Sequence, residues 1–260
     1  MKISVITVCY NSAKTIQDTL DSVASQTYTN LEYIIVDGLS KDNTMSIVDK
    51  SLPKLPANTI IISEKDRGIY DAMNKGLKQA SGDAVGFLNS DDVFAEPNAV
   101  ANIAETFKTE IVDIVYGNIV YTKQDDLNHI TRTWRTGVPP KHGMRHGWHP
   151  PHPAFYVKRS AIDQVGGFNL SYPIAADYEM MVRMIEKHRL KTAWCDHTTV
   201  RMREGGTSNA GPSAIYKANL ECLRAWKDNQ LSPSPLLIAG KLGSKLLQYI
   251  ATINHNDRGH

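Results

Sequence analysis

Adjacent carboxylates follow an apolar run in the segment AVGFLNSDDVF, which spans residues 84–94. Asp91 and Asp92 stand there side by side, and Asp37 ends a second apolar run, EYIIV. In open α/β sheets, ligands bind outside the carboxyl ends of the strands. Paired carboxylates at such a position can hold a hard divalent cation, and a single one can accept hydrogen bonds from a nucleobase or ribose. Turn chemistry is the alternative, because Asp side chains readily bond nearby backbone donors.

The glycine-rich phosphate cradles of common nucleotide-binding folds are absent from the sequence. No GxGxxG follows the first apolar run, and GxxxxGK[ST] does not occur. A nucleotide bound at the acidic segments would therefore need a cation to neutralise its phosphates.

The charge of the 260-residue chain is close to balance, at +2 from 29 basic and 27 acidic residues, so no nucleic-acid partner is indicated. Its three cysteines are widely spaced, which is typical of a reducing cytoplasm and argues against a disulfide framework. No apolar run reaches the roughly 18 to 20 residues that span a bilayer. We expect a cytoplasmic protein that could still lie on the inner face of the cell membrane.

Strand and helix patterns alternate through the first half of the chain, which predicts an α/β fold with a mostly parallel sheet and helices on both faces. The expected strands are 3–8, 31–37, 59–63 and 83–89, and the expected helices 13–26, 43–52, 69–80 and 97–109. The second half predicts antiparallel strands, a loop rich in Pro, Gly and His, and further helices. The antiparallel strands are expected at 113–122 and 129–136, the loop at 138–153 and the helices at 175–188, 213–227 and 234–252. A short strand is expected at 192–195.

Residues 3–44, 63–92 and 175–184 together look like a family 2 glycosyltransferase with the GT-A fold. The resemblance implies a Rossmann-like mixed sheet in a catalytic domain at 1–211, with a nucleotide-binding half (1–110) and an acceptor-side half (111–211). Residues 212–260 would form a C-terminal helical extension. Such enzymes are typically inverting, use a nucleotide-diphosphate sugar with Mn²⁺ or Mg²⁺, and often build bacterial surface polysaccharides such as lipopolysaccharide.

The resemblance also implies roles for the acidic strand ends. VCYN places Tyr10 against the nucleotide base with Val8 beside it, and Asp37 matches the aspartate that contacts the base. The family's Val-Asp-Asp-Gly-Ser is VDGLS here, so its second aspartate is missing. NSDD matches the family's metal motif, with Asp91 facing the ribose or metal and Asp92 as the direct ligand. Uridine is the expected base, with guanosine and thymidine open.

The segment EKDRGIYDAMN implies further donor contacts. By the same resemblance, Asp66 and Asn74 lie near the nucleotide, with Lys65 and Arg67 as contacts for the diphosphate.

Two arginines lie at the start of a glycine-containing loop expected at 203–213: Arg201 just before it and Arg203 as its first residue. Arg201, Arg203 and the following EGGTS resemble a segment that closes over the donor in related enzymes. Arginine suits the charge of a diphosphate, and glycines suit a hinge. A solvated loop with a basic face is the alternative.

Asp177 in AADYE matches the family's catalytic aspartate, which acts as general base. Its place at the start of a predicted helix would keep it ionised, because the helix dipole favours a negative charge there. An ordinary N-cap is the alternative.

Four histidines cluster in HGMRHGWHPPH, and a zinc site is one interpretation. The prolines exclude a helix, and the cysteines and carboxylates of common structural zinc sites are missing, so an active-site loop is favoured. By the resemblance, His152 lies near the acceptor and metal. Trp148 could stack on an acceptor sugar or simply be a buried aromatic.

The tail PLLIAGKLGSKLLQYIATI predicts an amphipathic helix with basic residues. Such a helix can lie on an acidic membrane, which would suit a polyprenyl-linked acceptor as well as a free glycan. Packing on its own domain or on a homodimer partner is the alternative.

Three functions are compatible with these motifs, and the inverting glycosyltransferase is favoured. A sugar-nucleotide nucleotidyltransferase would need a glycine-rich basic loop where CYNSAKT stands. A non-catalytic nucleotide- or sugar-binding module would leave Asp177 idle.

Overall fold

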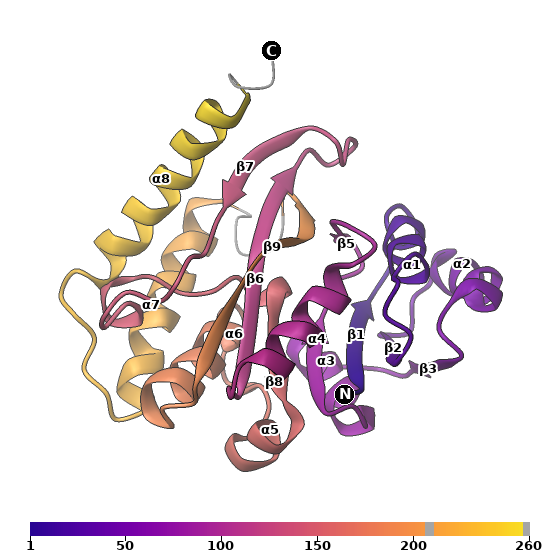
Figure 1. The fold of residues 1–260 in the computed structure, drawn as a ribbon, viewed down its shortest axis with the longest axis horizontal. Coiled ribbons are helices and arrows are strands. Elements are labelled where there is room, and N and C mark those ends of the chain that lie inside the picture. The colour runs from indigo at the N-terminus through magenta and orange to yellow at the C-terminus, as the bar shows by residue number, and fades with distance from the viewer. Residues whose placement is uncertain (206–210, 257–260) are drawn as a thin grey trace.

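The computed structural model describes residues 1–205 and 211–256, with side chains described except at 247 and 250–256. Its described part is a mixed α/β fold around one twisted sheet (Figure 1). The strands are β1 (Ile3–Cys9), β2 (Leu31–Asp37), β3 (Asn58–Ser63), β4 (Ala84–Phe87), β5 (Val93–Phe94), β6 (Ile114–Thr122), β7 (Ile130–Trp134), β8 (Phe155–Lys158) and β9 (Thr192–Arg203). They are ordered β3-β2-β1-β4-β8-β6-β9-β5, and β7 pairs with β6.

Helices cover both faces of the sheet. They are α1 (Ile16–Ala24), α2 (Thr44–Ser51), α3 (Ile69–Gln79), α4 (Ala99–Thr109), α5 (Arg159–Val165), α6 (Ala176–Met181), α7 (Pro212–Asp228) and α8 (Leu237–Asn256). Side chains of α1, α2 and α4 pack into one buried cluster, and those of α3, α5, α6 and α7 into the other. Because both faces are covered, every residue of β1 and β2 is buried, and most of them are apolar, as is typical of parallel strands.

The parallel strands end at one edge of the sheet. Cys9 pairs with Asp37, and Asp37 pairs with Ser63, at the last residues of β1, β2 and β3. The chain leaves β4 on the same side, since β4 is parallel to β1. The register therefore brings the three donor-side motifs of the sequence together.

The strand expected at 192–195 is longer than predicted. β9 runs to Arg203 and pairs with β6 in two stretches, on either side of a register shift near Asn118. Beyond the shift, β5 pairs with the other edge of β9. The sequence from Asp196 to Thr199 is polar, and the strand resumes after the register shift because β6 pairs with Thr198 and the residues that follow it.

The helix expected at 175–188 changes form partway. α6 ends at Met181, and a π-helical turn, Val182–Lys187, follows it. Arg183, in that turn, donates to Glu179 and to the carbonyls of residues 165–167. π-Helical turns are often found near functional sites.

The C-terminal helices share the core of the sheet. Cys222 and Trp226 of α7 and Leu237 of α8 are buried in the same cluster as α3 and α6. Among the described helices, none is both long and apolar enough to cross a bilayer.

Gly86 in β4 faces the ring of Tyr156 with no room for a side chain. An added Cβ would lie 2.6 Å from Tyr156 Cζ and closer still to two other ring carbons. We expect Gly86→Ala to lower the free energy of unfolding by about 1–3 kcal/mol, the usual effect of overpacking. Urea denaturation measures this. Gly243→Ala in α8 is the control, since a Cβ there meets nothing within 4 Å; equal stability of the two variants would contradict the packing argument.

Candidate active site

Tyr10, Gly38 and Asp66 meet at the carboxyl edge of the sheet. A Cβ on Gly38 would lie 3.3 Å from Tyr10 Cδ2 and in collision with Asp66 Oδ2. Tyr10 is 58% exposed, so its ring is available to a planar ligand. Asp66 Oδ1 accepts the backbone N–H of Gly68 at 2.8 Å and so shapes the entry into α3.

Asp37 lies beneath this cluster and is fully buried. Its carboxylate accepts the hydroxyls of Ser40 (2.5 Å) and Ser63 (2.7 Å) and the backbone N–H of Ser40. The adjacent Cys9 thiol is buried, and burial together with Asp37 raises the pKa of Cys9 to about 12. Val8 is also buried. In this structure Asp37 therefore holds the turn after β2, and neither Val8 nor Asp37 presents its side chain to solvent.

The acidic turn Asn89–Asp92 follows β4. Asp92 is 1% exposed; its Oδ2 accepts Asn89 Nδ2 at 3.1 Å, and its Oδ1 accepts the backbone N–H of Arg203 at 3.3 Å. Burial raises the pKa of Asp92 well above its ordinary value, and the neighbouring Asp91 carboxylate raises it further. Burial also raises the pKa of Asp91. Two carboxylates are thus held together in surroundings that disfavour their negative charge.

These groups fit a divalent cation. Asn89 Oδ1 is buried and has no hydrogen-bond partner within the described structure, which leaves an amide oxygen beside two carboxylates. Mg²⁺ and Mn²⁺ prefer such oxygen ligands, and Mg²⁺ commonly takes one or two carboxylates together with substrate phosphates. No three His, Cys, Asp or Glu side chains of the described residues form a metal group, so His152 does not join Asp91 and Asp92.

Arg203 does not belong to an open loop over the donor, as the sequence suggested. It ends β9, is 5% exposed, and donates to Asp18 (2.5 Å), to the Asp91 carbonyl (2.7 Å) and to the Gln124 carbonyl (3.0 Å). The guanidinium group of Arg203 is thus already hydrogen-bonded within the protein, where it holds the acidic turn in place. Arg201 lies in β9 and donates to the Leu127 carbonyl. Of the EGGTS segment (204–208), residues 206–208 lie outside the described residues.

Removing the Arg203 side chain should therefore weaken the fold and the acidic turn together. We expect Arg203→Met to lower the free energy of unfolding by about 1–3 kcal/mol, because charge-assisted hydrogen bonds are lost. Urea denaturation measures the change. Arg201→Met, which loses a single carbonyl contact, is the matched control and should cost less. A larger loss in Arg201→Met would contradict the role given to Arg203.

Asp177 reaches the donor half of the chain through Tyr70. Its Oδ1 accepts the Tyr70 hydroxyl at 3.1 Å and the backbone N–H of Tyr178 at 2.8 Å. Tyr70 also donates to the Ile174 carbonyl at 2.7 Å, and burial together with Asp177 raises its pKa. Glu221 of α7 accepts the backbone N–H groups that precede α6. Tyr70 and Glu221 were not predicted from the sequence, because each acts on residues more than 40 positions away.

His152 is packed between aromatic rings close to Asp177. Its ring stacks on Phe87 at 5.2 Å and meets Phe168 edge-on at 5.5 Å. Its Nε2 is buried without a hydrogen-bond partner in the described part of the chain. Burial lowers the pKa of His152, and the Asp177 carboxylate opposes this shift. A neutral imidazole is therefore placed beside the base candidate with one nitrogen unused.

Two other loop residues serve the packing. Trp148 is partly buried; it donates its indole N–H to the Thr136 carbonyl at 3.0 Å and packs edge-on to Tyr116. His149 lies edge-on to two aromatic rings, and burial lowers its pKa to about 4.

The remaining donor-side candidates are Asn74 and the basic residues before α3. The Asn74 amide pairs with the backbone of Phe168 through both its oxygen (2.8 Å) and its nitrogen (2.9 Å), so it holds the chain before α6 against α3. Arg67 pairs with Asp71, and Lys65 is exposed.

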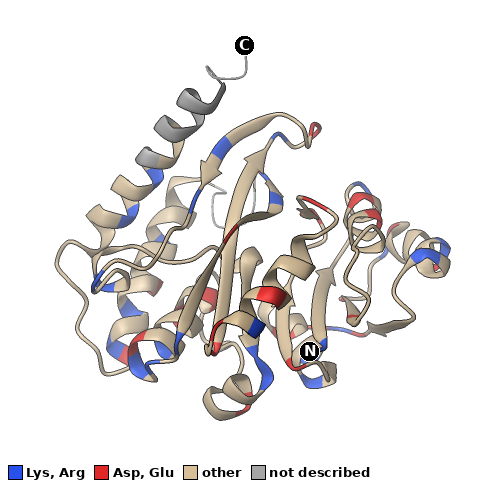
Figure 2. Cartoon of the chain, in the orientation of Figure 1, with Lys and Arg blue, Asp and Glu red and all other residues tan. Residues whose placement is uncertain are grey.

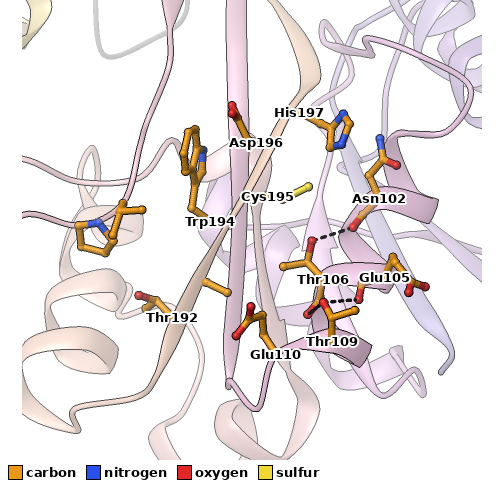
Figure 3. A pocket seen from close by; sticks show the side chains of 13 residues that line it. Asn102, Glu105, Thr106, Thr109, Glu110, Thr192, Trp194, Cys195, Asp196 and His197 are labelled. Atoms are coloured by element: carbon orange, nitrogen blue, oxygen red, sulfur yellow. Dashed lines mark hydrogen bonds between the residues drawn. The ribbon is translucent and has the colours of Figure 1, made fainter.

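A cavity of about 570 Å³ lies elsewhere, between α4 and the first half of β9 (Figure 3). Glu105 and Thr106 of α4 line one side, and Trp194 and Asp196 of β9 line the other. None of the site residues predicted from sequence lines it.

Comparison with known proteins gives the family. Residues 4–166 match the sequence profile of Glycosyl transferase family 2, which is more than half of the chain. The chain belongs to this family. A PGL/p-HBAD biosynthesis glycosyltransferase of Mycobacterium tuberculosis is 30% identical to this glycosyltransferase over 215 residues, 79% of the chain and 78% of the relative.

Solved structures of low sequence identity share the fold. Staphylococcus aureus TarS superposes with a TM-score of 0.66 at 21% identity, covering 94% of this chain and 71% of that one. A mannosyltransferase of Pyrobaculum calidifontis superposes with a TM-score of 0.67 at 18% identity, covering 100% and 76%. The GT-A fold predicted from the sequence is thereby confirmed.

Proposed function

We propose that this family 2 glycosyltransferase is an inverting enzyme that moves a sugar from a nucleotide-diphosphate sugar to a hydroxyl of a glycan or polyprenyl-linked acceptor. One observation carries the proposal. The Tyr70–Asp177 hydrogen bond joins the acceptor half to the start of α3, immediately after Asp66 and the donor-side cluster. A carboxylate is thereby fixed beside the edge of the sheet where the donor motifs end.

The donor proposed is a UDP-sugar. TarS has been solved with UDP and UDP-GlcNAc, the Pyrobaculum mannosyltransferase with GDP-Man and Mn²⁺, and a glucosyl-3-phosphoglycerate synthase of M. tuberculosis with UDP and Mn²⁺. In this chain the exposed Tyr10 ring would pack on the base. Asp37 would act by holding the turn that shapes the base pocket, and Asp66 and Lys65 would lie near the ribose and diphosphate.

Asp91, Asp92 and the Asn89 amide oxygen would hold Mn²⁺ or Mg²⁺. A cation there would stabilise the negative charge that develops on the departing diphosphate. Arg203 would keep the turn in place by holding the Asp91 carbonyl, rather than by contacting the diphosphate.

Asp177 would act as the general base. Its two described hydrogen bonds both fall on Oδ1, so we assign Oδ2 as the atom that takes the proton of the acceptor hydroxyl. The acceptor oxygen then forms a bond to the anomeric carbon as the bond to the diphosphate breaks on the opposite face, which inverts the configuration. His152, neutral and with Nε2 unused, would position the acceptor.

The setting proposed is the cytoplasm, where the three unpaired cysteines would stay reduced. The exposed surface of α8 would contact either the inner face of the membrane or a second copy of the chain.

The experiment is a transfer assay with UDP-, GDP- and dTDP-sugars in the presence of Mn²⁺, read by release of the nucleoside diphosphate. The proposal expects one nucleotide to be preferred, and NMR of the product to show inversion at the anomeric carbon. A product that retains the donor configuration would overturn the mechanism. Binding of a nucleotide with no turnover of any sugar would favour the non-catalytic binding module.

A further inference from the structure

The cavity between α4 and the first half of β9, called the α4–β9 cavity below, follows an unpaired edge of the sheet. Six consecutive residues, Thr192–His197, line it. Successive side chains of a strand point to opposite faces. Accordingly, Figure 3 shows Trp194 and Asp196 on one side of β9 and Cys195 on the side of α4. A cavity lined from both faces must run along the edge between them.

The edge of β9 that faces the cavity has no strand partner among the described strands. β6 pairs with the opposite edge of this half of β9, and β5 joins β9 only from Val200 onward. Backbone N–H and C=O groups at such an edge are hydrogen-bonding groups that a ligand can use.

The charge of the α4–β9 cavity is negative. Glu105, Glu110 and Asp196 line it, and no Lys or Arg of the described residues does. Figure 2 shows acidic positions on both α4 and β9. Lys108 pairs with Glu105 at 3.3 Å and Arg135 pairs with Asp196 at 2.6 Å, both from outside the lining. The cavity therefore disfavours phosphates, and its acidic side chains form no metal group within the described residues.

An aromatic ring and an unpaired amide also line the cavity. The Trp194 indole N–H donates to Asn118 Oδ1 at 2.9 Å, and the Arg135 guanidinium lies 5.3 Å from the ring centroid, so the ring is held in place. Asn102 of α4 has a buried Nδ2 with no hydrogen-bond partner in the described part of the chain. An amide of this kind is stabilised when a ligand oxygen accepts its hydrogen bond.

We propose that the α4–β9 cavity binds a neutral saccharide. The apolar C–H face of a sugar ring would pack on Trp194, while its hydroxyls donate to the carboxylates and accept from the Asn102 amide. The volume of about 570 Å³ lies within the range of about 300–1,000 Å³ that is usual for ligand sites. A peptide added to β9 as a further strand is the weaker fit, because α4 lies along this edge (Figure 3).

The α4–β9 cavity is joined to the acceptor side of the active site. Residues 138–139, at the start of the loop that leads to His152, also line it. Asn118 Oδ1 accepts both the Trp194 indole N–H and the Thr136 backbone N–H, each at 2.9 Å, and the Thr136 carbonyl accepts the indole N–H of the loop residue Trp148. This connection favours a unit of the acceptor glycan as the saccharide; that last step alone rests on the proposed function.

The test is calorimetric titration of the purified chain with neutral trisaccharides of glucose, galactose, mannose and N-acetylglucosamine, and with trigalacturonic acid as their anionic counterpart. We expect at least one neutral trisaccharide to bind and trigalacturonic acid not to bind. The double variant Glu105→Ala, Glu110→Ala should weaken that binding roughly tenfold or more. Both glutamates are exposed, so the fold should survive. Glu96→Ala is the matched control and should bind as the wild type does, because Glu96 is exposed just before α4 but does not line the cavity.

No binding of any of the four neutral trisaccharides would overturn the proposal. Equal binding by the double variant would overturn it too, since the saccharide would then lie elsewhere, and so would preferred binding of trigalacturonic acid. Titration of the same protein with UDP and Mn²⁺ separates this result from the proposed function. Trisaccharide binding without nucleotide binding would remove that function alone, and nucleotide binding without trisaccharide binding would remove only the saccharide site.

Discussion

Replacing Asp177 with Asn is expected to lower the rate of sugar transfer by about 10²–10⁴-fold while nucleotide binding stays intact. The amide keeps the size of the carboxylate and can still accept the Tyr70 hydroxyl at Oδ1, but it cannot take a proton from the acceptor. The fold should therefore survive, and the loss should appear in kcat rather than in donor affinity.

Steady-state transfer and calorimetric UDP binding measure the two effects separately. Tyr70→Phe is the companion variant, because it removes a hydroxyl that positions Asp177 without removing the base, and its loss of rate should be smaller. Transfer by Asp177→Asn within a few-fold of the wild type would exclude Asp177 as the base. A loss of UDP binding equal to the loss of rate would indicate a structural role instead.

Replacing Asp92 with Asn should abolish the stabilisation of the protein by Mn²⁺ and yet make the metal-free protein more stable. Burial and the neighbouring Asp91 raise the pKa of Asp92, so the native state binds its proton more tightly than the unfolded chain does. The free energy of unfolding therefore falls as the pH rises from about 3.9, the ordinary pKa of an aspartate, towards the higher pKa of Asp92 in the folded protein. At neutral pH, Asp92→Asn should therefore raise the free energy of unfolding of the metal-free protein by about 1–3 kcal/mol.

Thermal unfolding with and without Mn²⁺ measures both effects, at roughly 2–4 °C per kcal/mol. Asp125→Asn, at an exposed position in the chain between β6 and β7, is the control and should change neither the melting temperature nor the response to Mn²⁺. A lower melting temperature for metal-free Asp92→Asn, combined with a wild-type response to Mn²⁺, would contradict the metal assignment.

The donor half of the fold could be predicted because its signals are local. The buried parallel strands β1 and β2 are mostly apolar over their whole length, and helices such as α1 repeat their apolar residues along one face. The polar residue that ends each run then marks the carboxyl edge of the sheet. Asp37 and Asp92 were found in this way, although their burial was not foreseen.

The remaining parts depend on contacts that are distant in sequence. Arg203 pairs with Asp18 across 185 positions, and Tyr70 meets Asp177 across 107. The spacing of apolar residues along the sequence carries no information about such pairs. The second half of β9 was missed for the same reason, since its polar residues form a strand only because β5 and β6 flank them. Asn74 matched a family motif, but its amide serves the backbone of Phe168.

Calorimetric titration of the wild-type protein with UDP, GDP and dTDP, each with and without Mn²⁺, shows whether the carboxyl edge of the sheet binds a nucleotide together with a metal ion. We expect one nucleotide, UDP first among them, to bind with Mn²⁺ and to bind far more weakly without it. We also expect Asp92→Ala to lose this dependence on Mn²⁺. Binding that is indifferent to Mn²⁺, or no binding of any of the three nucleotides, would contradict the assignment of the carboxyl edge of the sheet as the donor site.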